Sequence, residues 1–249
     1  MHIAYHVSLI GIVVFPGSNC DRDIYHVLKN IMHVDVEFIW HKREDLNCYY
    51  DAIVIPGGFA YADRLRAGII AAFSPVMQAV KRLARDGVPV IGICNGFQIL
   101  VESGLLPGAF MRNDSLTFTC RWTMLRLNVN GSRTPFTLLL KKGTRLNIPV
   151  ANQEGKYYVD DDTLKEMEKN EQIVFKYEDN PNGSLYDIAG VCNAEGNVLG
   201  MMPHPERACE MILAPSSSTN LSTNTGYGDG ILIFRSLIEY LQGKQKVSI

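Results

Sequence analysis

Cys94 stands between two glycines, at the point where a buried strand is expected to give way to a helix. Val88–Ile93 is mostly apolar and predicts the strand, and a helical pattern follows as far as Ser103. A strand that turns sharply into a helix around G-x-C-x-G has the form of a nucleophile elbow, with cysteine in place of serine. Gly92 and Gly96 permit the strained turn and the close approach of neighbouring backbone. The partial positive charge at the start of the helix favours a thiolate at Cys94.

A thiolate nucleophile needs a base and a group that orients this base. The segment Met202-Pro-His-Pro-Glu206 offers both, because His204 lies between two prolines and Glu206 follows two residues later. Pro205 biases His204 toward an extended conformation. Residues two apart in an extended segment face the same side, so the Glu206 carboxylate is expected to hold the tautomer of His204.

Backbone donors for a developing oxyanion are expected at two places. The predicted strand Ala52–Ile55 leads into Gly57 and Gly58, whose amides no side chain shields. The amide of Asn95, immediately after the nucleophile, is the usual second donor in an elbow. The residue types and their spacing therefore predict a thiolate nucleophile with its base, its orienting carboxylate and its oxyanion donors.

The elements that must position these groups alternate between strand and helix in the first half of the chain. Strands are predicted at Leu9–Phe15, Asp35–Trp40, Ala52–Ile55 and Val88–Ile93, with helices at Asp21–Met32 and Arg66–Asp86. This order predicts a parallel sheet with helices on both faces, and such sheets carry their sites at the carboxyl ends of the strands. Antiparallel additions to this sheet are expected from further strands at Leu116–Trp122, Thr123–Val129, Ile173–Tyr177, Asp187–Cys192 and Val198–Met202. Glu195-Gly196-Asn197 predicts a hairpin turn between the last two. A loop at 215–230 and a closing helix from Ile231 to Leu241 follow.

Composition narrows the class of protein. The chain has 249 residues, 47% of them hydrophobic, and a formal net charge of -2, which gives no reason to expect a nucleic acid or a membrane as partner. Six cysteines without a C-x-x-C pair indicate reduced thiols and a cytoplasmic location. Residues 1–8 are interpreted as an N-terminal extension, and residues 9–249 as one domain.

Several segments together resemble one known family. They are Phe15-Pro-Gly-Ser-Asn-Cys-Asp-Arg-Asp23, Pro56-Gly-Gly-Phe59 with Leu65-Arg-Ala-Gly68, Gly92-Ile-Cys-Asn-Gly-Phe-Gln98 and Met202-Pro-His-Pro-Glu-Arg207. This set is similar to the triad-type (class I) glutamine amidotransferases, and within them to the glutaminase subunits of phosphoribosylformylglycinamidine synthase. The resemblance implies a flavodoxin-like three-layer α/β fold with a mostly parallel central sheet and added antiparallel strands, formed by a type-1 glutamine amidotransferase domain.

The resemblance also implies an activity and its partners. Cys94, His204 and Glu206 would hydrolyse L-glutamine to glutamate and ammonia, with Gly57, Gly58 and Asn95 at the oxyanion. Gln98 would contact the amino-acid end of the substrate, although a solvent-facing helix residue is the plainer interpretation. Ammonia would pass to a synthetase subunit that uses ATP and magnesium, often with a small accessory subunit, in purine biosynthesis. Neither a cofactor nor a metal is expected in this chain, which lacks a Walker-type phosphate loop.

Other interpretations remain open at this stage. Another triad amidotransferase, serving guanylate, cytidylate or anthranilate synthesis, would share the triad but not Asn95 and the Asp21-Arg-Asp23 signature. A stand-alone cysteine hydrolase would carry histidine in place of Asn95, and a silent glutamine-binding subunit would not need an intact triad. The chain also departs from the family pattern at Ala60-Tyr-Ala-Asp-Arg64, where a glycine is usual third, and at Val150–Gly155, where many relatives carry a histidine. Arg207 is expected only to pair with an acidic neighbour.

Overall fold

A nine-stranded mixed sheet forms the centre of the protein. The computed structural model describes residues 8–46, 50–215 and 226–247, so residues 1–7 of the expected extension and 216–225 of the expected loop lie outside the described part. Across the sheet the strands run in the order β2 (Asp35–Trp40), β1 (Leu9–Val14), β3 (Ala52–Ile55), β4 (Val90–Ile93), β11 (Val198–Met201), β10 (Ile188–Cys192), β9 (Ile173–Tyr177), β6 (Thr119–Leu127) and β7 (Arg145–Asn152).

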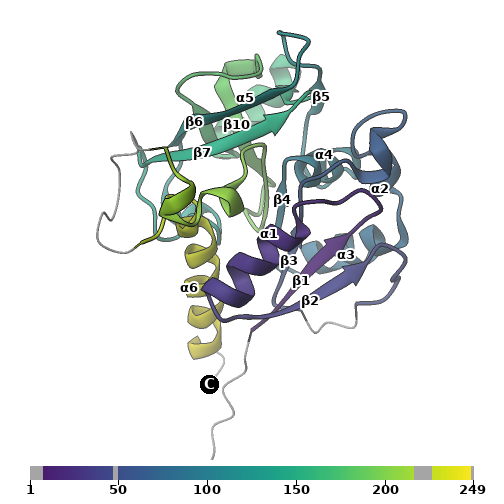
Figure 1. The fold of residues 1–249 in the computed structure, drawn as a ribbon, viewed down its shortest axis with the longest axis vertical. Helices are drawn as coiled ribbons and strands as arrows, with labels where there is room; N and C mark the ends of the chain where they lie inside the picture. The colour runs from purple at the N-terminus through teal and green to yellow at the C-terminus, as the bar shows by residue number, and fades with distance from the viewer. Residues whose placement is uncertain (1–7, 47–49, 216–225, 248–249) are drawn as a thin grey trace, which may run out of the picture.

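The first five strands of this order are parallel to one another, which was predicted for β2, β1, β3 and β4 but not for β11. β3 and β4 are buried at every residue, which explains why their sequences are continuous apolar runs without alternation. Helix α1 (Asp21–Tyr25) crosses the near face of β1 and β3, whereas α3 (Pro75–Arg85) covers the far face (Figure 1). The mostly parallel sheet with added antiparallel strands and flanking helices confirms the expected fold class.

The parallel register brings three chain segments to one edge of the sheet. Ile93, the last residue of β4, pairs with Met201, the last residue of β11, and Ile55 at the end of β3 pairs with Gly92. The chain therefore leaves all three strands at the same level. The segments that follow them begin with Pro56, Cys94 and Met202, which are the segments in which the chemistry was predicted.

The structure divides the predicted helix over Arg66–Asp86 into two helices, with Pro75 at the start of the second. Helix α2 (Ile69–Ala72) is separated from α3 by Phe73 and Ser74. Pro75 lacks an N–H donor and clashes with a preceding helical turn, so it is accommodated only at the start of a helix. Here it is the first residue of α3, with Ser74 in an extended conformation before it.

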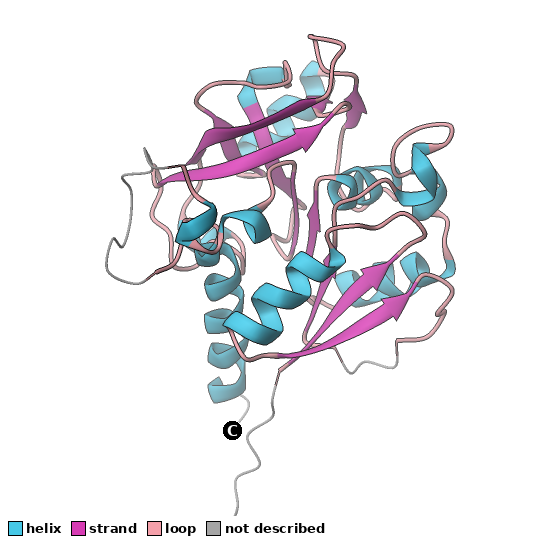
Figure 2. Ribbon diagram, viewed as in Figure 1, coloured by secondary structure: helices cyan, strands magenta, loops and turns pink. Residues whose placement is uncertain are grey.

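The second half of the chain adds an antiparallel layer. β10 and β11 form the predicted hairpin around Gly196, whose φ of 84° suits the turn. The two strands predicted at Leu116–Trp122 and Thr123–Val129 are in fact one long strand, β6, which pairs with β7 on one side and β9 on the other. Figure 2 shows the long β6 and β7 arrows rising above the parallel strands.

A small aromatic cluster fixes the helix behind the elbow. Helix α4 (Asn95–Glu102) carries Phe97, which lies 4.8 Å from Phe110 and 5.7 Å from Tyr157 between ring centroids. Phe110 belongs to β5 (Ala109–Met111) and Tyr157 to β8 (Lys156–Tyr158), which form a separate two-stranded sheet.

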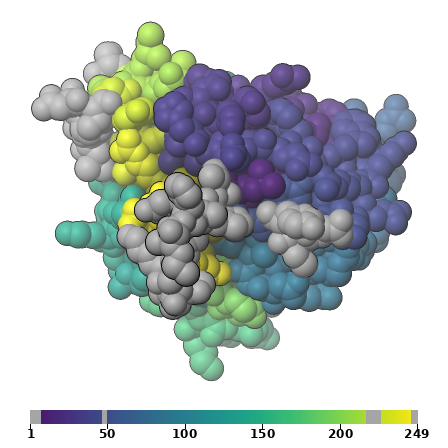
Figure 3. All heavy atoms as spheres, turned by 90° about the horizontal axis from the view of Figure 1, so that it is seen from below, coloured from purple at the N-terminus to yellow at the C-terminus, as the bar shows by residue number. Residues whose placement is uncertain are grey.

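Two further helices complete the fold. α5 (Asp161–Lys169) begins at Asp160, whose carboxylate accepts from the amides of Asp162 and Thr163. α6 (Ile231–Val247) extends the predicted closing helix and, seen from below, lies between the purple-blue first part of the chain and the green-teal second part (Figure 3). Among the described residues, no helix combines the length and the apolar character needed to cross a membrane.

Candidate active site

The turn at Cys94 is a strained elbow, as its flanking glycines predict. Cys94 has φ 51° and ψ -107°, outside the regions that L-residues ordinarily adopt. A Cβ on Gly96 would overlap the carbonyl oxygen of Ile55, and a Cβ on Gly92 would lie 2.5 Å from the Gly96 oxygen. Both positions therefore need glycine, because only then can α4 start so close to β3. The Cys94 thiol is buried and donates to the Ala151 carbonyl at 3.6 Å.

His204 and Glu206 form a buried pair. Nδ1 of His204 and Oε1 of Glu206 are 2.7 Å apart, and both side chains are shielded from solvent. The expected extended geometry is wrong, because Pro205–Ala208 forms a 3₁₀ turn. The pairing still forms, since His204 itself is not helical (φ -100°, ψ 89°) and its amide donates to the Pro149 carbonyl at 2.8 Å. The tertiary hydrogen bond therefore orients the ring.

The charges around His204 favour its imidazolium form. Burial alone would lower the pKa of His204, but the negative charge of Glu206, then that of Cys94, and the nearby sulfurs of Cys20 and Cys94 raise this pKa well above its usual range. Nε2 of His204 has no hydrogen-bond partner among the described residues. Since Glu206 occupies Nδ1, Nε2 is the ring nitrogen left for Cys94 and for a substrate.

Gly57 lies in the space between the nucleophile and the base. A Cβ at this position would be 2.8 Å from Cε1 of His204 and 3.4 Å from Cβ of Cys94. A contact under 3 Å is shorter than packed side chains accept, so these three residues already fill the space. Segments that are far apart in the sequence therefore meet here, with the imidazole close to Cys94.

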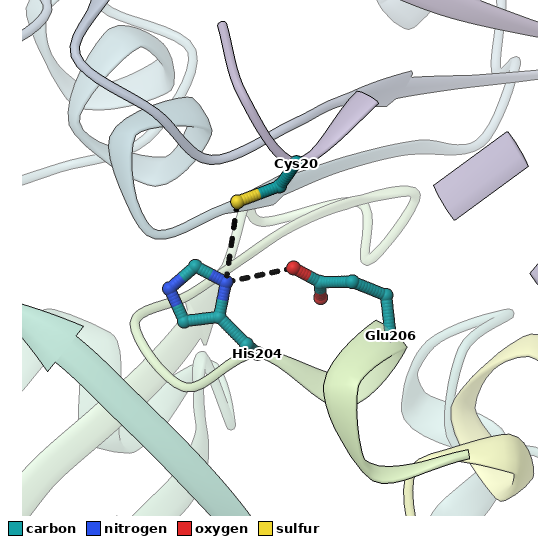
Figure 4. A group of neighbouring side chains, drawn as sticks. All are labelled: Cys20, His204 and Glu206. Carbon is teal, nitrogen blue, oxygen red and sulfur yellow. Dashed lines mark hydrogen bonds and ion pairs between the residues drawn. The ribbon is translucent and has the colours of Figure 1, made fainter. Parts of the chain in front are cut away.

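Cys20 is a second thiol against the same imidazole, as Figure 4 shows. Its Sγ lies 3.9 Å from Nδ1 of His204 and 3.0 Å from a guanidinium nitrogen of Arg207. Burial, with a smaller opposing contribution from the hydrogen bond to His204, raises the pKa of the Cys20 thiol. Arg207 also pairs with Asp23 at 3.2 Å, the acidic neighbour expected for it. The sequence had indicated only a reduced core or loop cysteine here, although the residue belongs to the Gly-Ser-Asn-Cys-Asp-Arg-Asp motif.

Within the described part of the chain, one group of side chains has the spacing that a bound metal ion would need. It consists of Cys20, His204 and Glu206, whose possible ligand atoms lie within 4.8 Å of one another. The Arg207 guanidinium already supplies a positive charge at the Cys20 sulfur. Hydrogen bonds within the protein therefore account for this group.

The two expected oxyanion donors flank the elbow. Neither the Gly58 amide nor the Asn95 amide donates to a group within the described ranges of the chain. Gly58 has φ 148°, and a Cβ there would lie 2.7 Å from the Gly17 carbonyl oxygen and 2.8 Å from the Asn19 amide nitrogen. The loop that carries Cys20 is thus packed directly on the Gly-Gly turn, and this packing fixes the direction of its amides.

Gln98 is buried, so the interpretation of a solvent-facing helix residue is wrong. Its Oε1 accepts from the Asn95 side chain at 2.9 Å, and its Nε2 donates to the Glu154 carbonyl at 2.7 Å. The side-chain nitrogen Nδ2 of Asn95 also donates to Oδ1 of Asp63 at 3.2 Å. Burial, reinforced by the charge of Glu154, raises the pKa of Asp63 to about 6. A polar chain from Asp63 to Glu154 therefore lines the start of α4, and the sequence did not indicate Asp63.

Ala62 stands at the position where the family resemblance predicts a glycine, and its backbone has a conformation that glycine favours. Ala62 has φ 57° and ψ 31°, a left-handed conformation that favours glycine. Tyr61, Asp63 and Leu65 also have positive φ. The loop thus retains a glycine-like path at Ala62 at some cost in backbone strain.

Comparisons with known proteins agree with this geometry. A solved chain of PurLQS from Thermotoga maritima is 38% identical, with a TM-score of 0.79, over 94% of this chain and 99% of that one. A putative GMP synthase protein from Thermoplasma acidophilum is 14% identical, with a TM-score of 0.63, over 98% of each chain. A glutamine amidotransferase from Thermotoga maritima is 15% identical, with a TM-score of 0.53, over 81% of this chain and 77% of that one.

The last two likenesses show the fold alone, because both identities are low. Residues 8–241 match the family of CobB/CobQ-like glutamine amidotransferase domains. Since this match covers nearly the whole chain, including the elbow and the His204–Glu206 pair, the protein belongs to the CobB/CobQ-like glutamine amidotransferase family.

Proposed function

We propose that this chain is the glutaminase subunit of phosphoribosylformylglycinamidine synthase, and that Cys94, His204 and Glu206 are its catalytic triad. The observation that carries the proposal is the strained cysteine elbow beside a buried histidine–glutamate pair. The likeness to a chain of PurLQS at 38% identity supports this member of the family over the guanylate-type enzymes, whose matching structure is 14% identical.

In the first half of the reaction, the Cys94 thiolate attacks the side-chain amide carbon of glutamine. The carbonyl π electrons move to oxygen, and the amides of Gly58 and Asn95 stabilise the resulting oxyanion. When the carbonyl re-forms, the C–N bond breaks. The His204 imidazolium gives its Nε2 proton to the leaving nitrogen, so that neutral ammonia departs and a glutamyl thioester remains. The raised pKa of His204 suits this role, because the ring then carries the proton before the bond breaks.

In the second half, the now neutral His204 takes a proton from water, which attacks the thioester carbon. Collapse of this second tetrahedral intermediate breaks the C–S bond, releases glutamate and restores the thiolate. Glu206 keeps Nδ1 protonated throughout, so Nε2 faces the reacting atoms as base and then as acid. Cys20, which Arg207 contacts, also lies against Nδ1 of the ring.

The amino-acid end of glutamine is proposed to lie near Gln98. Both polar atoms of the Gln98 side chain bond to the protein. Gln98 therefore acts by fixing Asn95 and the backbone at Glu154 around that end of the substrate.

Ammonia released into water becomes ammonium and loses its nucleophilic lone pair, so the activity is useful only with a partner. We propose a synthetase subunit that uses ATP and magnesium, with a small accessory subunit, in the cytoplasm. No Walker-type loop is present in the sequence, so the nucleotide is assigned to the partner.

The test measures glutamate release from glutamine by the wild type and by Cys94→Ala, each with and without the purified synthetase. We expect activity in the wild type, rising with the partner, and none above background in Cys94→Ala. Cys120→Ala is the matched control, because Cys120 is an exposed free cysteine. Equal glutamate release by wild type and Cys94→Ala would remove Cys94 from the chemistry. No release by the wild type in any mixture would indicate a silent subunit.

A further inference from the structure

Three neutral polar side chains beside the nucleophile are buried without hydrogen-bond partners. Among the described residues, no partner is found for Nδ2 and Oδ1 of Asn152, the hydroxyl of Tyr177, or Nδ2 of Asn182. Asn152, Tyr177 and Asn182 are 4%, 3% and 2% exposed. Because nearly all buried polar groups in folded proteins are hydrogen-bonded, four such atoms together indicate a small polar molecule that occupies the space between them.

The frame around these atoms is firmly bonded. The Asn152 carbonyl accepts from Nδ2 of Asn113 at 2.9 Å, and Oδ1 of Asn113 accepts from the Gly155 amide at 2.9 Å. Oδ1 of Asn182 accepts from the Ser184 amide at 3.2 Å. A Cβ on Gly155 would overlap Oδ1 of Asn152 and lie 2.5 Å from Nδ2 of Asn182, so both amides lie over the same face of Gly155. The backbone is thus fixed while the side-chain ends stay unpaired.

The group extends to the reacting sulfur. Ala151, which precedes Asn152, accepts the Cys94 thiol at 3.6 Å through its carbonyl oxygen. Burial raises the pKa of the Tyr177 phenol, the nearby Asn182 side chain lowers it by less, and a negative charge at Cys94 raises it further. Both Asn182 and Cys94 are therefore close enough to the Tyr177 hydroxyl to affect its ionisation.

The chemistry of the group selects a neutral ligand. Two carboxamides and a phenol offer donors for one lone pair and acceptors for N–H groups, and none of them carries a charge. Burial away from a counter-ion disfavours ammonium relative to ammonia. We propose that Asn152, Tyr177 and Asn182 form a holding site for the neutral ammonia released at Cys94. This inference rests on the proposed function, and it adds the place where ammonia is kept unprotonated before it leaves the chain.

Hydroxylamine is a suitable probe, since it is a small neutral amine that attacks the thioester in place of water. Its nitrogen bonds to the thioester carbon, the C–S bond breaks, and the proton lost from nitrogen passes through His204, giving γ-glutamyl hydroxamate and a restored thiolate. The ratio of hydroxamate to glutamate is measured against hydroxylamine concentration, in the complex of this chain with its synthetase. For the wild type we expect a ratio that saturates, as binding at a site requires.

Tyr177→Phe and Asn152→Leu remove hydrogen-bonding atoms at nearly constant volume. In the double variant we expect the ratio at low hydroxylamine to fall at least fivefold and to become linear in concentration. The same variant is expected to lose more ammonia to solution per product formed. Tyr157→Phe is the matched control, because the Tyr157 hydroxyl is equally buried but donates to the Pro107 carbonyl at 2.7 Å. Its ratio should equal that of the wild type.

Each other outcome overturns the inference in a recognisable way. Suppose that the wild-type complex forms glutamate, but its ratio of hydroxamate to glutamate rises linearly with hydroxylamine concentration. The group would then hold only structural water. Equal ratios in the wild type and the double variant would have the same meaning. A tenfold rise in KM for glutamine with an unchanged ratio would assign the group to the amino-acid end of the substrate. If the wild-type complex forms no glutamate at all, the proposed function itself fails, and this inference fails with it.

Discussion

A methyl group added at Gly57 is the sharpest test of the active-site geometry. Gly57 lacks a positive φ, so alanine can adopt its backbone conformation, and the effect of Gly57→Ala is steric. The new Cβ would lie 2.8 Å from Cε1 of His204 and 3.1 Å from Sγ of Cys20. Since ordinary contacts begin near 3.4 Å, the imidazole or the Gly-Gly turn must move by about 0.6 Å or more.

The size of that displacement sets the expected cost. A shift of about 1 Å at reacting groups lowers rates roughly 10²-fold, so we expect kcat for glutamine hydrolysis to fall about 10- to 10²-fold, or roughly 1.4 to 2.7 kcal/mol of barrier. Overpacking a filled site typically costs about 1 to 3 kcal/mol of stability. Gly57→Ala should therefore remain folded at 25 °C while losing most of its activity.

The assay combines glutamate release in the complex with urea unfolding of the isolated chain. Gly243→Ala is the control, because nothing lies within 4 Å of the Cβ that it adds in α6. That change should leave kcat unaltered and raise the unfolding free energy by up to about 1 kcal/mol, since alanine favours helix more than glycine does. Full activity in Gly57→Ala, with no change in stability, would refute the close packing of His204 against the Gly-Gly turn.

Three further changes test separate features. Glu206→Gln removes the charge that raises the pKa of His204 and leaves the ring without its tautomer-fixing acceptor, so kcat should fall about 10²- to 10⁴-fold; a fall under threefold would contradict this role. Ala62→Gly relieves a left-handed conformation and should raise the unfolding free energy by about 0.5 to 1 kcal/mol in urea titrations, whereas a loss of stability would show that Ala62 is not strained. Folding raises the pKa of Asp63 to about 6 from 3.8, so the folded state favours the protonated acid. The resulting contribution to the unfolding free energy is fully present below pH 3.8 and is lost as the pH rises through 6. The always-neutral Asp63→Asn should thus exceed wild-type stability by about 1 to 2 kcal/mol above pH 6 and match it at pH 3.8, and equal stability at pH 8 would contradict the raised pKa.

The parallel half of the fold could be predicted from the sequence because its signals are local. β3 and β4 are short apolar runs, and the glycines around Cys94 predict the turn after β4. The chain leaves both strands at one edge of the sheet, so the approximate meeting of the Gly-Gly turn and Cys94 followed from topology. His204 joined them because the last strand of the hairpin lies parallel to β4.

The remaining features depend on contacts that no local pattern reveals. The extended geometry predicted for His204 and Glu206 is wrong, yet the two side chains meet because the Pro149 carbonyl holds the His204 amide from a strand of the antiparallel half. Cys20 resembles any buried cysteine until the fold places it 3.0 Å from Arg207, a residue 187 positions later. The raised pKa of Asp63 depends on its burial and on the charge of Glu154, and neither can be read from the local sequence.

The antiparallel half is therefore part of the active site, although none of the predicted triad residues belongs to it. β7 accepts a hydrogen bond from the His204 amide at the Pro149 carbonyl and one from the Cys94 thiol at the Ala151 carbonyl. These carbonyls are two residues apart, so they point to the same edge of the strand. One strand thus fixes the base and the nucleophile relative to each other. A change that shifts β7 against β4 alters both contacts together, so the position of β7 sets the separation of Cys94 and His204. A partner subunit that pressed on the β6–β7 layer would have a direct mechanical route to the chemistry.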